Sequence, residues 1–164
     1  MSTIEQDLQR LALQEQVLQL ERFDETVAWE LGTRIKAICE ARAVGVTIEI
    51  RRSKETLFFY AMPGTTPNNA EWVRRKRNTV DLLQCSSYSS GLANQKAGSS
   101  LSQRTGVSLS DYAEHGGSFP VRVKGVGCVG TVTVSGVPQR EDHAIVVEAL
   151  AAQCGVTPAE VCLD

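Results

Sequence analysis

The chain has 164 residues, of which 42% are hydrophobic and 22% charged, and its formal net charge at pH 7 is −2. This composition predicts a single globular domain over residues 1–164, with no electrostatic reason for a nucleic acid partner. No apolar run reaches the ~20 residues that span a bilayer. The N-terminus lacks the basic and apolar regions of a signal peptide, so we also expect no membrane partner.

Two helices are predicted at the start of the chain. Ile4, Leu8 and Leu11 share one stripe over residues 4–20, beside a second apolar stripe, so this helix has a broad apolar face. Such a face often packs on something besides its own domain, and we expect residues 1–20 to take part in oligomer contacts. Asp24 is a suitable N-cap for a second helix over residues 25–42.

A β-hairpin and a third helix are predicted next. Residues 46–51 alternate apolar and polar side chains, and residues 56–62 are apolar on both faces, which predicts that the second strand is the more central one. Asn69 is a candidate cap for a helix that runs from about residue 70 into the high eighties. Residues 94–113 are polar and predict short helical turns and loop.

Two further strands, at 121–123 and 131–134, precede a last helix over residues 139–153. The order α-α-β-β-α-loop-β-β-α predicts a mainly antiparallel sheet covered by helices, and it lacks the βαβ alternation of a Rossmann sheet. The letters Gly125 to Gly130 match G-x-G-x-x-G, but a strand follows where a nucleotide-binding helix would begin. We therefore interpret this segment as a hairpin turn.

The five cysteines are odd in number and no two have C-x-x-C spacing, which favours neither a zinc site nor a thioredoxin-type site. Reduced thiols in a cytoplasmic protein are the simplest interpretation. The residues are Cys39, Cys85, Cys128, Cys154 and Cys162.

The richest segment runs from His115 to His143 and holds six of the thirteen glycines. Glycine permits positive φ and close backbone approach. Pro138 suits the first turn of the last helix, whose N-terminus favours an anion, and Arg140 adds positive charge. A capped helix without a ligand is the alternative, because acidic residues 141 and 142 already supply negative charge there.

His115 and His143 are candidate metal or iron ligands if the fold brings them together. The positions three and four residues after His143 are valines, so no second ligand lies on the same helical face, and satisfied polar histidines are the alternative. Imidazoles titrate near neutral pH, but neither histidine has a nucleophile beside it. A hydrolase or lyase is therefore the least favoured hypothesis.

Four cations follow one another at residues 74–77. Successive helical residues spread around roughly 300°, so they form no single basic face, and a solvated helix surface is one interpretation. The other is that two of them bind a phosphate or propionate, Arg74 or Arg77 together with Lys76 or Arg75.

Two motifs resemble a known family. His-Gly-Gly-x-Phe-Pro at His115–Pro120 and Val-Ser-Gly-x-Pro-Gln-x-x-Asp-His at Val134–His143 resemble a branch of the GlcG/HbpS-like family, whose domain is named haem-degrading. The resemblance extends over most of the chain. It implies an α/β (α+β) fold of the profilin-like three-layer α/β/α type with a mainly antiparallel sheet, and homo-oligomers. Members of the broader family bind haem or occur with cobalamin and glycolate or diol metabolism.

We therefore expect an oligomeric, cytoplasmic protein that binds a small molecule, either haem or another tetrapyrrole, or a different anionic organic ligand. The alternative is an assembly or adaptor protein that acts through its oligomeric surface without ligand chemistry. In the first case His115 or His143 would ligate iron or move protons, and arginines would hold carboxylates. The expected ligand-binding residues are His115, Gly116, Gly117, Phe119, Gly136, Pro138, Arg140, His143, Arg74 and Arg77.

Overall fold

The structure is a computed structural model that describes residues 1–164, and it contains seven helices and five strands. The helices are α1 (Ile4–Val17), α2 (Glu25–Ala41), α3 (Pro67–Leu83), α4 (Ser87–Ala97), α5 (Leu101–Thr105), α6 (Gln139–Cys154) and α7 (Pro158–Val161). The strands are β1 (Gln19–Leu20), β2 (Thr47–Arg52), β3 (Glu55–Ala61), β4 (Ser118–Val123) and β5 (Gly127–Ser135). No helix is both long and apolar enough to cross a membrane.

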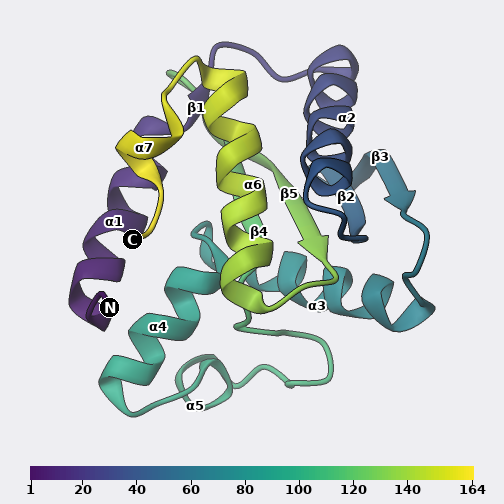
Figure 1. Cartoon of the computed structure of the whole chain (residues 1–164). Coiled ribbons are helices and arrows are strands. Elements are labelled where there is room, and N and C mark those ends of the chain that lie inside the picture. The colour runs from purple at the N-terminus through teal and green to yellow at the C-terminus, as the bar shows by residue number, and fades with distance from the viewer.

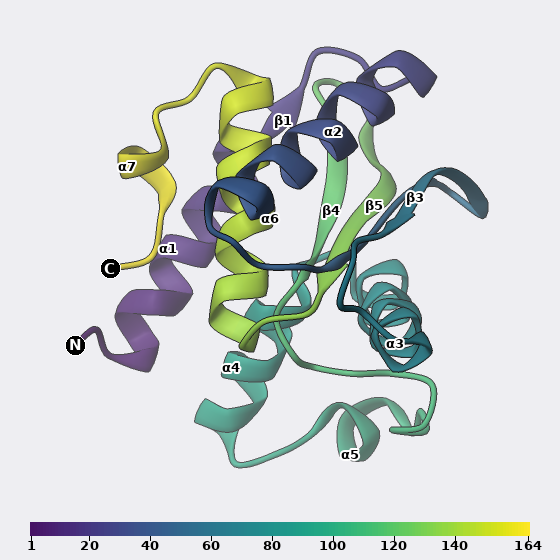
Figure 2. The same cartoon turned by 45° about the vertical axis from the view of Figure 1, so that its right-hand side comes forward.

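The strands form one sheet in the order β1-β4-β5-β2-β3. Only the short β1 pairs in parallel, with β4, and every other pair is antiparallel. Helices α2 and α6 cover one face of the sheet and α3 covers the other, as Figure 1 and the turned view in Figure 2 show. The predicted α/β fold with a mainly antiparallel sheet between helices is confirmed.

The two faces of the sheet differ in chemistry. Ile48 of β2 and Val132 of β5 belong to the main apolar core together with residues of α2 and α6. The side chains that alternate with them are polar and buried, among them Glu49 and Thr133. Because successive strand residues point to opposite faces, this polar row lies on the side of α3, where Glu49 pairs with Arg77. The interface that α3 makes with the sheet is therefore built largely from polar contacts.

The boundary of the first helix differs from the predicted one. The helix ends at Val17, and Gln19 and Leu20 then pair with β4. Leu11 and Leu18 of the broad apolar face are buried within the chain, against α4 and α7 and in the main core. An oligomer contact of residues 1–20 stays a prediction. Such a contact would have to use the half-buried part of this face, which includes Leu8.

The hairpin is confirmed, but its second strand lies at the edge of the sheet. We expected β3 to be central because residues 56–62 are apolar on both faces. In the structure β2 is the inner strand, and Phe59 of β3 faces solvent. The error arises because an apolar run does not distinguish a buried strand from an edge strand that exposes apolar side chains.

The third helix also differs in its ends. Thr66 rather than Asn69 is the N-cap, and the side chain of Asn69 accepts a hydrogen bond from the backbone N–H of Thr66. The helix ends at Leu83, where Gln84 takes a positive φ. Ser86 then caps a separate helix, α4, inside the segment predicted to be the end of α3. The turn between β4 and β5 is a hairpin as predicted, with Gly125 and Gly127 at positive φ. It is shorter than the predicted turn over residues 125–130, because β5 already begins at Gly127.

Candidate functional site

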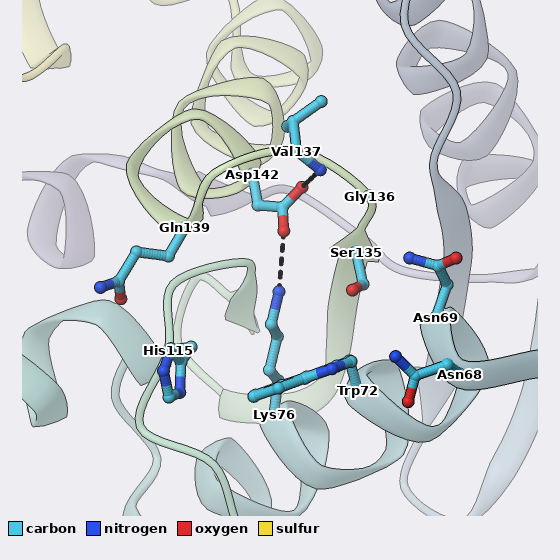
Figure 3. Close-up of a pocket in the computed structure, with 10 residues that line it drawn as sticks. All are labelled: Asn68, Asn69, Trp72, Lys76, His115, Ser135, Gly136, Val137, Gln139 and Asp142. Atoms are coloured by element: carbon cyan, nitrogen blue, oxygen red, sulfur yellow. Dashed lines mark hydrogen bonds and ion pairs between the residues drawn. The ribbon is translucent and has the colours of Figure 1, made fainter. Parts of the chain in front are cut away.

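A polar pocket of about 270 Å³ lies where α3 and α6 begin and β5 ends. Figure 3 shows side chains from these elements pointing into one space, with the loop before β4 closing the opposite side. Only two of its ten lining residues are hydrophobic. The lining residues are Asn68, Asn69, Trp72, Lys76, His115, Ser135, Gly136, Val137, Gln139 and Asp142.

Two glycines let the backbone approach this pocket closely. Gly117 has a φ of 134°, and a Cβ placed there would lie 2.5 Å from the carbonyl oxygen of Val134 and 2.8 Å from Nζ of Lys76. At Gly136, a Cβ would lie 2.4 Å from the carbonyl oxygen of Gly45. Any larger residue would therefore push apart the strands and the lysine that form the pocket.

A buried ion pair lies at the back of the pocket. Nζ of Lys76 donates to Oδ2 of Asp142 at 2.8 Å and to the carbonyl oxygen of Val134 at 3.3 Å. The other carboxylate oxygen of Asp142 accepts the N–H of Val137 at 3.1 Å, as drawn in Figure 3. Lys76 and Asp142 are 3% and 1% exposed. The pair therefore connects α3 to the start of α6, and both side chains line the pocket.

Burial shifts both members of this pair toward their neutral forms. Desolvation lowers the pKa of Lys76, although the charge of Asp142 opposes that shift. Desolvation also raises the pKa of Asp142, against the opposing charge of Lys76. Because both directions favour neutral species, a proton can move between the two groups at less cost than it would between the same groups in water.

His115 and Trp72 form an aromatic wall on the side of the pocket. Their rings pack edge to face with centroids 4.9 Å apart, and the guanidinium of Arg75 lies 4.4 Å from the centre of the Trp72 ring. Burial lowers the pKa of His115, and the positive charges of Lys76 and Arg75 lower it further. The imidazole is therefore neutral at pH 7 and offers one donor and one acceptor.

Two helix N-termini converge on this pocket. Asn68 and Asn69 lie in the first turn of α3, which carries no acidic residue, and Gln139 opens α6. The N-terminus of a helix carries partial positive charge. At α3 this charge, and not a set of free N–H groups, faces the pocket, because Pro67 has no N–H and the N–H of Asn69 donates to the carbonyl oxygen of Thr66. Glu141 and Asp142 partly offset this charge at α6, but nothing in the first turn offsets it at α3. The pocket therefore favours an anionic group near α3.

The structure does not bring the two histidines together. His115 lines the pocket, whereas His143 is 1% exposed and lies between Tyr88 and Phe119. Nε2 of His143 lies 2.8 Å from Oε1 of Gln14, and burial lowers its pKa to about 3. A shared metal or iron site for the two histidines is therefore not formed within this chain, where no group of three or more His, Cys, Asp or Glu residues is placed to hold a metal.

None of the predicted arginines lines the pocket. Arg74 pairs with Glu71 and Asp111, Arg77 with Glu49, and Arg140 with Asp7. Lys76 occupies the pocket instead, because on the helix its direction differs by about 200° from that of Arg74 and by about 100° from that of Arg77. Phe119 lies in the core and Pro138 caps α6, and neither lines the pocket. Of the predicted residues, His115 and Gly136 line it, Gly117 packs against Lys76, and the N–H of Gly116 donates to Oε1 of Gln139.

Sequence reasoning missed Asp142 as a site residue and treated Lys76 only as an alternative to its neighbours. One signal for Lys76 was present, because a lysine among the apolar inner positions of a helix needs a buried partner. Nothing local pointed to Asp142 as that partner, since 66 residues separate the two.

Comparisons of sequence and of structure with known proteins point to the same family and fold. The sequence profile of the haem-degrading protein HbpS-like family matches residues 23–151. A UPF0303 protein of Azotobacter vinelandii is 51% identical over 161 residues, which covers 98% of this chain and 97% of that protein. The crystal structure of the Ybr137w protein superimposes with a TM-score of 0.81 at 27% identity, over 90% of this chain and 87% of that one. The crystal structure of a PduOC:heme complex gives 0.69 at 17% identity, over 79% and 94% of the two chains.

Proposed function

We propose that this chain, which belongs to the haem-degrading protein HbpS-like family, binds a small anionic organic molecule in the pocket between α3 and α6. The observation that carries the proposal is the convergence of two helix N-termini on one polar pocket that also contains a buried lysine. Helix dipoles and amide side chains that are fixed in this way bind a carboxylate without having to reorganise.

The size and lining of the pocket define the ligand class. Its volume of about 270 Å³ lies just below the ~300–1,000 Å³ range of ligand pockets. Amide groups of Asn68, Asn69 and Gln139 and the hydroxyl of Ser135 supply donors and acceptors around it. A short carboxylic acid with one or two further polar groups matches this lining.

Haem does not fit these residues. A haem needs a wide apolar surface and an axial ligand, whereas this pocket is small and mostly polar. His115 is the one imidazole that lines it, and its ring packs edge to face with that of Trp72. Arg74, Arg77 and Arg140, which were expected to hold propionates, are already paired with carboxylates. The haem of the PduOC:heme complex is therefore not carried over to this pocket.

Calorimetric titration with pyruvate, as a simple probe of the ligand class, tests the proposal. We expect saturable binding that weakens in Asn69→Asp, because this substitution places a negative charge at the mouth of the pocket. Asp keeps the oxygen that accepts the N–H of Thr66, so the fold is retained. Gln95→Glu makes the same kind of change on an exposed part of α4 and should leave binding unchanged. Equal affinity in the two variants would contradict the proposal.

Titration with haemin tests the family's named ligand separately. We expect no saturable shift of the Soret band that depends on the pocket. A saturable shift that disappears in His115→Ala would replace the small acid with haem as the ligand.

A second candidate function, assembly into homo-oligomers, is supported by an exposed apolar surface formed by residues of α2 and the edge strand β3. Figure 2 shows where these two elements lie in the fold. Trp29 is 65% exposed and Phe59 is 51% exposed, and they border a hollow of about 620 Å³. The outer edge of β3 presents unpaired backbone groups that a second copy can pair with. Exposed apolar patches of this kind mark interfaces.

The mass of the particle in solution tests this assembly. We expect Trp29→Ser combined with Phe59→Ser to lower the mass measured by light scattering, while Leu109→Ser, which alters an exposed apolar residue elsewhere, leaves it unchanged. A wild-type protein that is already monomeric would remove this candidate. For the cellular location we propose the cytoplasm, where the five free cysteines stay reduced.

A further inference from the structure

Lys76 is placed differently from the other lysines of the chain. It is the one lysine that lines the pocket, and its ammonium group is fixed between Asp142 and the carbonyl oxygen of Val134. Lys36 pairs with a carboxylate at the surface, and Lys54, Lys96 and Lys124 are exposed. An ammonium group has three donors, so two of those on Lys76 have protein partners.

We propose that Lys76 is a nucleophile that forms a reversible imine with the carbonyl group of a short 2-oxo acid or aldehyde acid held in this pocket. The inference rests on the proposed function and makes its substrate class specific. Its geometric basis is the juxtaposition of a fixed amine, a buried carboxylate and a neutral imidazole around one polar cavity.

A structural role alone is a weak explanation for this pair. Burying a lysine and an aspartate costs desolvation that their attraction does not reliably repay, and an apolar pair of similar size often stabilises as well. The Lys76–Asp142 pair also faces a cavity, although a pair that only holds α3 to α6 could be fully enclosed. Lysine is, in addition, the side chain that proteins use for Schiff-base chemistry when it is desolvated.

Asp142 is positioned to manage the proton. An amine attacks a carbonyl carbon only in its neutral form, and burial lowers the pKa of Lys76 while it raises the pKa of Asp142. The 2.8 Å contact between Nζ and Oδ2 is a direct path for that proton. The N–H of Val137 holds the opposite carboxylate oxygen and so keeps the accepting oxygen directed at Lys76.

The step balances without any other reactant. Lys76 first gives one proton to Asp142, and the lone pair of Nζ then attacks the carbonyl carbon while the π electrons move to oxygen. A proton moves from nitrogen to that oxygen and gives a carbinolamine. Asp142 returns its proton to the hydroxyl group, which leaves as water, and the nitrogen lone pair forms the C=N bond of the protonated imine. The net change is one carbonyl and one ammonium converted to one iminium and one water.

The same pocket explains why an acid is preferred over a simple aldehyde. The first turn of α3 presents Asn68 and Asn69 and no acidic residue, so a carboxylate is stabilised there. His115 lies on the other wall and is neutral at pH 7, so it can take a proton from the carbon beside an iminium. The carboxylate of the substrate would then face the start of α3, its carbonyl carbon would face Lys76, and the C–H beside that carbon would face His115.

Borohydride trapping on the wild-type protein tests this inference without relying on a variant that folds. The protein is mixed with pyruvate and sodium borohydride, which reduces an imine to a stable secondary amine, and the modified lysine is located by peptide mass spectrometry. A carbonyl held in the pocket beside Nζ reacts at a much higher effective concentration than one in solution. We therefore expect labelling of Lys76 to exceed that of each other lysine at least ~10-fold; those lysines are Lys36, Lys54, Lys96 and Lys124.

Lactate separates this inference from the proposed function, because it carries the carboxylate but no carbonyl. Lactate should bind by calorimetry, give no trapped product and reduce labelling by pyruvate. Saturable binding of pyruvate with no label on Lys76, or with label spread over the exposed lysines, would overturn the imine and leave anion binding standing. Absence of binding by both acids would overturn the proposed function itself.

Discussion

Gly117 lies directly against the charged end of Lys76, so that a Cβ at position 117 would be 2.8 Å from Nζ. The same Cβ would lie 3.2 Å from Cβ of Asp142 and 2.5 Å from the carbonyl oxygen of Val134. The second glycine of the His-Gly-Gly motif therefore packs against the buried ion pair. Gly117 does not line the cavity, but it leaves the space that the side chains of Lys76 and Asp142 occupy behind it.

Gly117→Ala should disturb both stability and binding. Its φ of 134° is strained for any L side chain, and the contact with the Val134 carbonyl cannot relax without moving β5. We expect a loss of about 2–4 kcal/mol in the free energy of unfolding, together with loss of pyruvate binding. Chemical denaturation and calorimetry measure the two effects.

Gly98→Ala is the matched control, because Gly98 also has a positive φ but no atom lies within 4 Å of its added Cβ. It should cost about 1 kcal/mol for the left-handed backbone alone and leave binding intact. If the two alanine variants lost the same amount of stability, the close contact at Gly117 would have no energetic meaning.

Lys76→Met should be more harmful than replacing both members of the pair. The single variant leaves the carboxylate of Asp142 buried without its cation, which costs about 3–5 kcal/mol. In Lys76→Met combined with Asp142→Asn, the amide oxygen still accepts the N–H of Val137 and no net charge is buried, so stability should return to within about 2 kcal/mol of wild type. Denaturation curves give both values.

The double variant should stay folded, and because methionine has no amine, its peptide that contains position 76 serves as the unlabelled control for the trapping experiment. A double variant that was no more stable than Lys76→Met would contradict the account of the pair as a charge-balanced unit.

The fold was largely predictable from the sequence because each element carries its own local signal. Asp24 caps α2 as predicted, and the glycines at 125 and 127 form the turn that the β-type residues after them indicated. The edge position of β3 was not predictable, because its apolar residues serve an exposed surface rather than the core. Strand order depends on pairing between distant segments, which no local pattern contains.

The site was predictable only in outline. The run from His115 to His143 does contain two walls of the pocket, but α6 carries apolar residues around much of its circumference, so the sequence did not show that His143 faces the core. Asp142, its neighbour, faces the pocket instead. The pairing of Asp142 with Lys76 joins segments that only the folded chain brings together.

Gln14→Ala should destabilise the attachment of α1 to the rest of the fold. The amide of Gln14 lies 2.8 Å from Nε2 of His143 and donates to the carbonyl oxygen of Val161 at 2.8 Å. Truncation leaves two buried polar groups without partners and a small cavity, and we expect a loss of about 3 kcal/mol in the free energy of unfolding. Gln16→Ala, on the exposed side of the same helix, should change it by less than about 0.5 kcal/mol. Similar losses in both variants would mean that helix propensity, not the buried network, sets the effect.

Acid should destabilise the protein through His143. Burial, with a smaller contribution from the charge of Arg140, lowers the pKa of His143 in the folded state to about 3, from an ordinary value of 6.5. Between these two values the unfolded chain binds a proton that the folded chain does not, so stability falls as the pH is lowered through that window and is fully present above pH 6.5. The folding equilibrium constant should fall by up to about tenfold per pH unit from this group alone.

Other buried groups titrate in the same range, so the effect of His143 has to be isolated by difference. The raised pKa of Asp142 acts in the opposite direction, because the folded chain then binds its proton more readily than the unfolded chain does. His143→Gln removes the imidazole and leaves Asp142 in place, and denaturant titrations of both proteins from about pH 4 to about pH 7 give two stability curves. The wild type should be the steeper of the two, with its excess slope confined to the region below pH 6.5. Parallel curves would mean that the folded protein accepts a proton at His143 without penalty, and that the buried contact with Gln14 opens in acid.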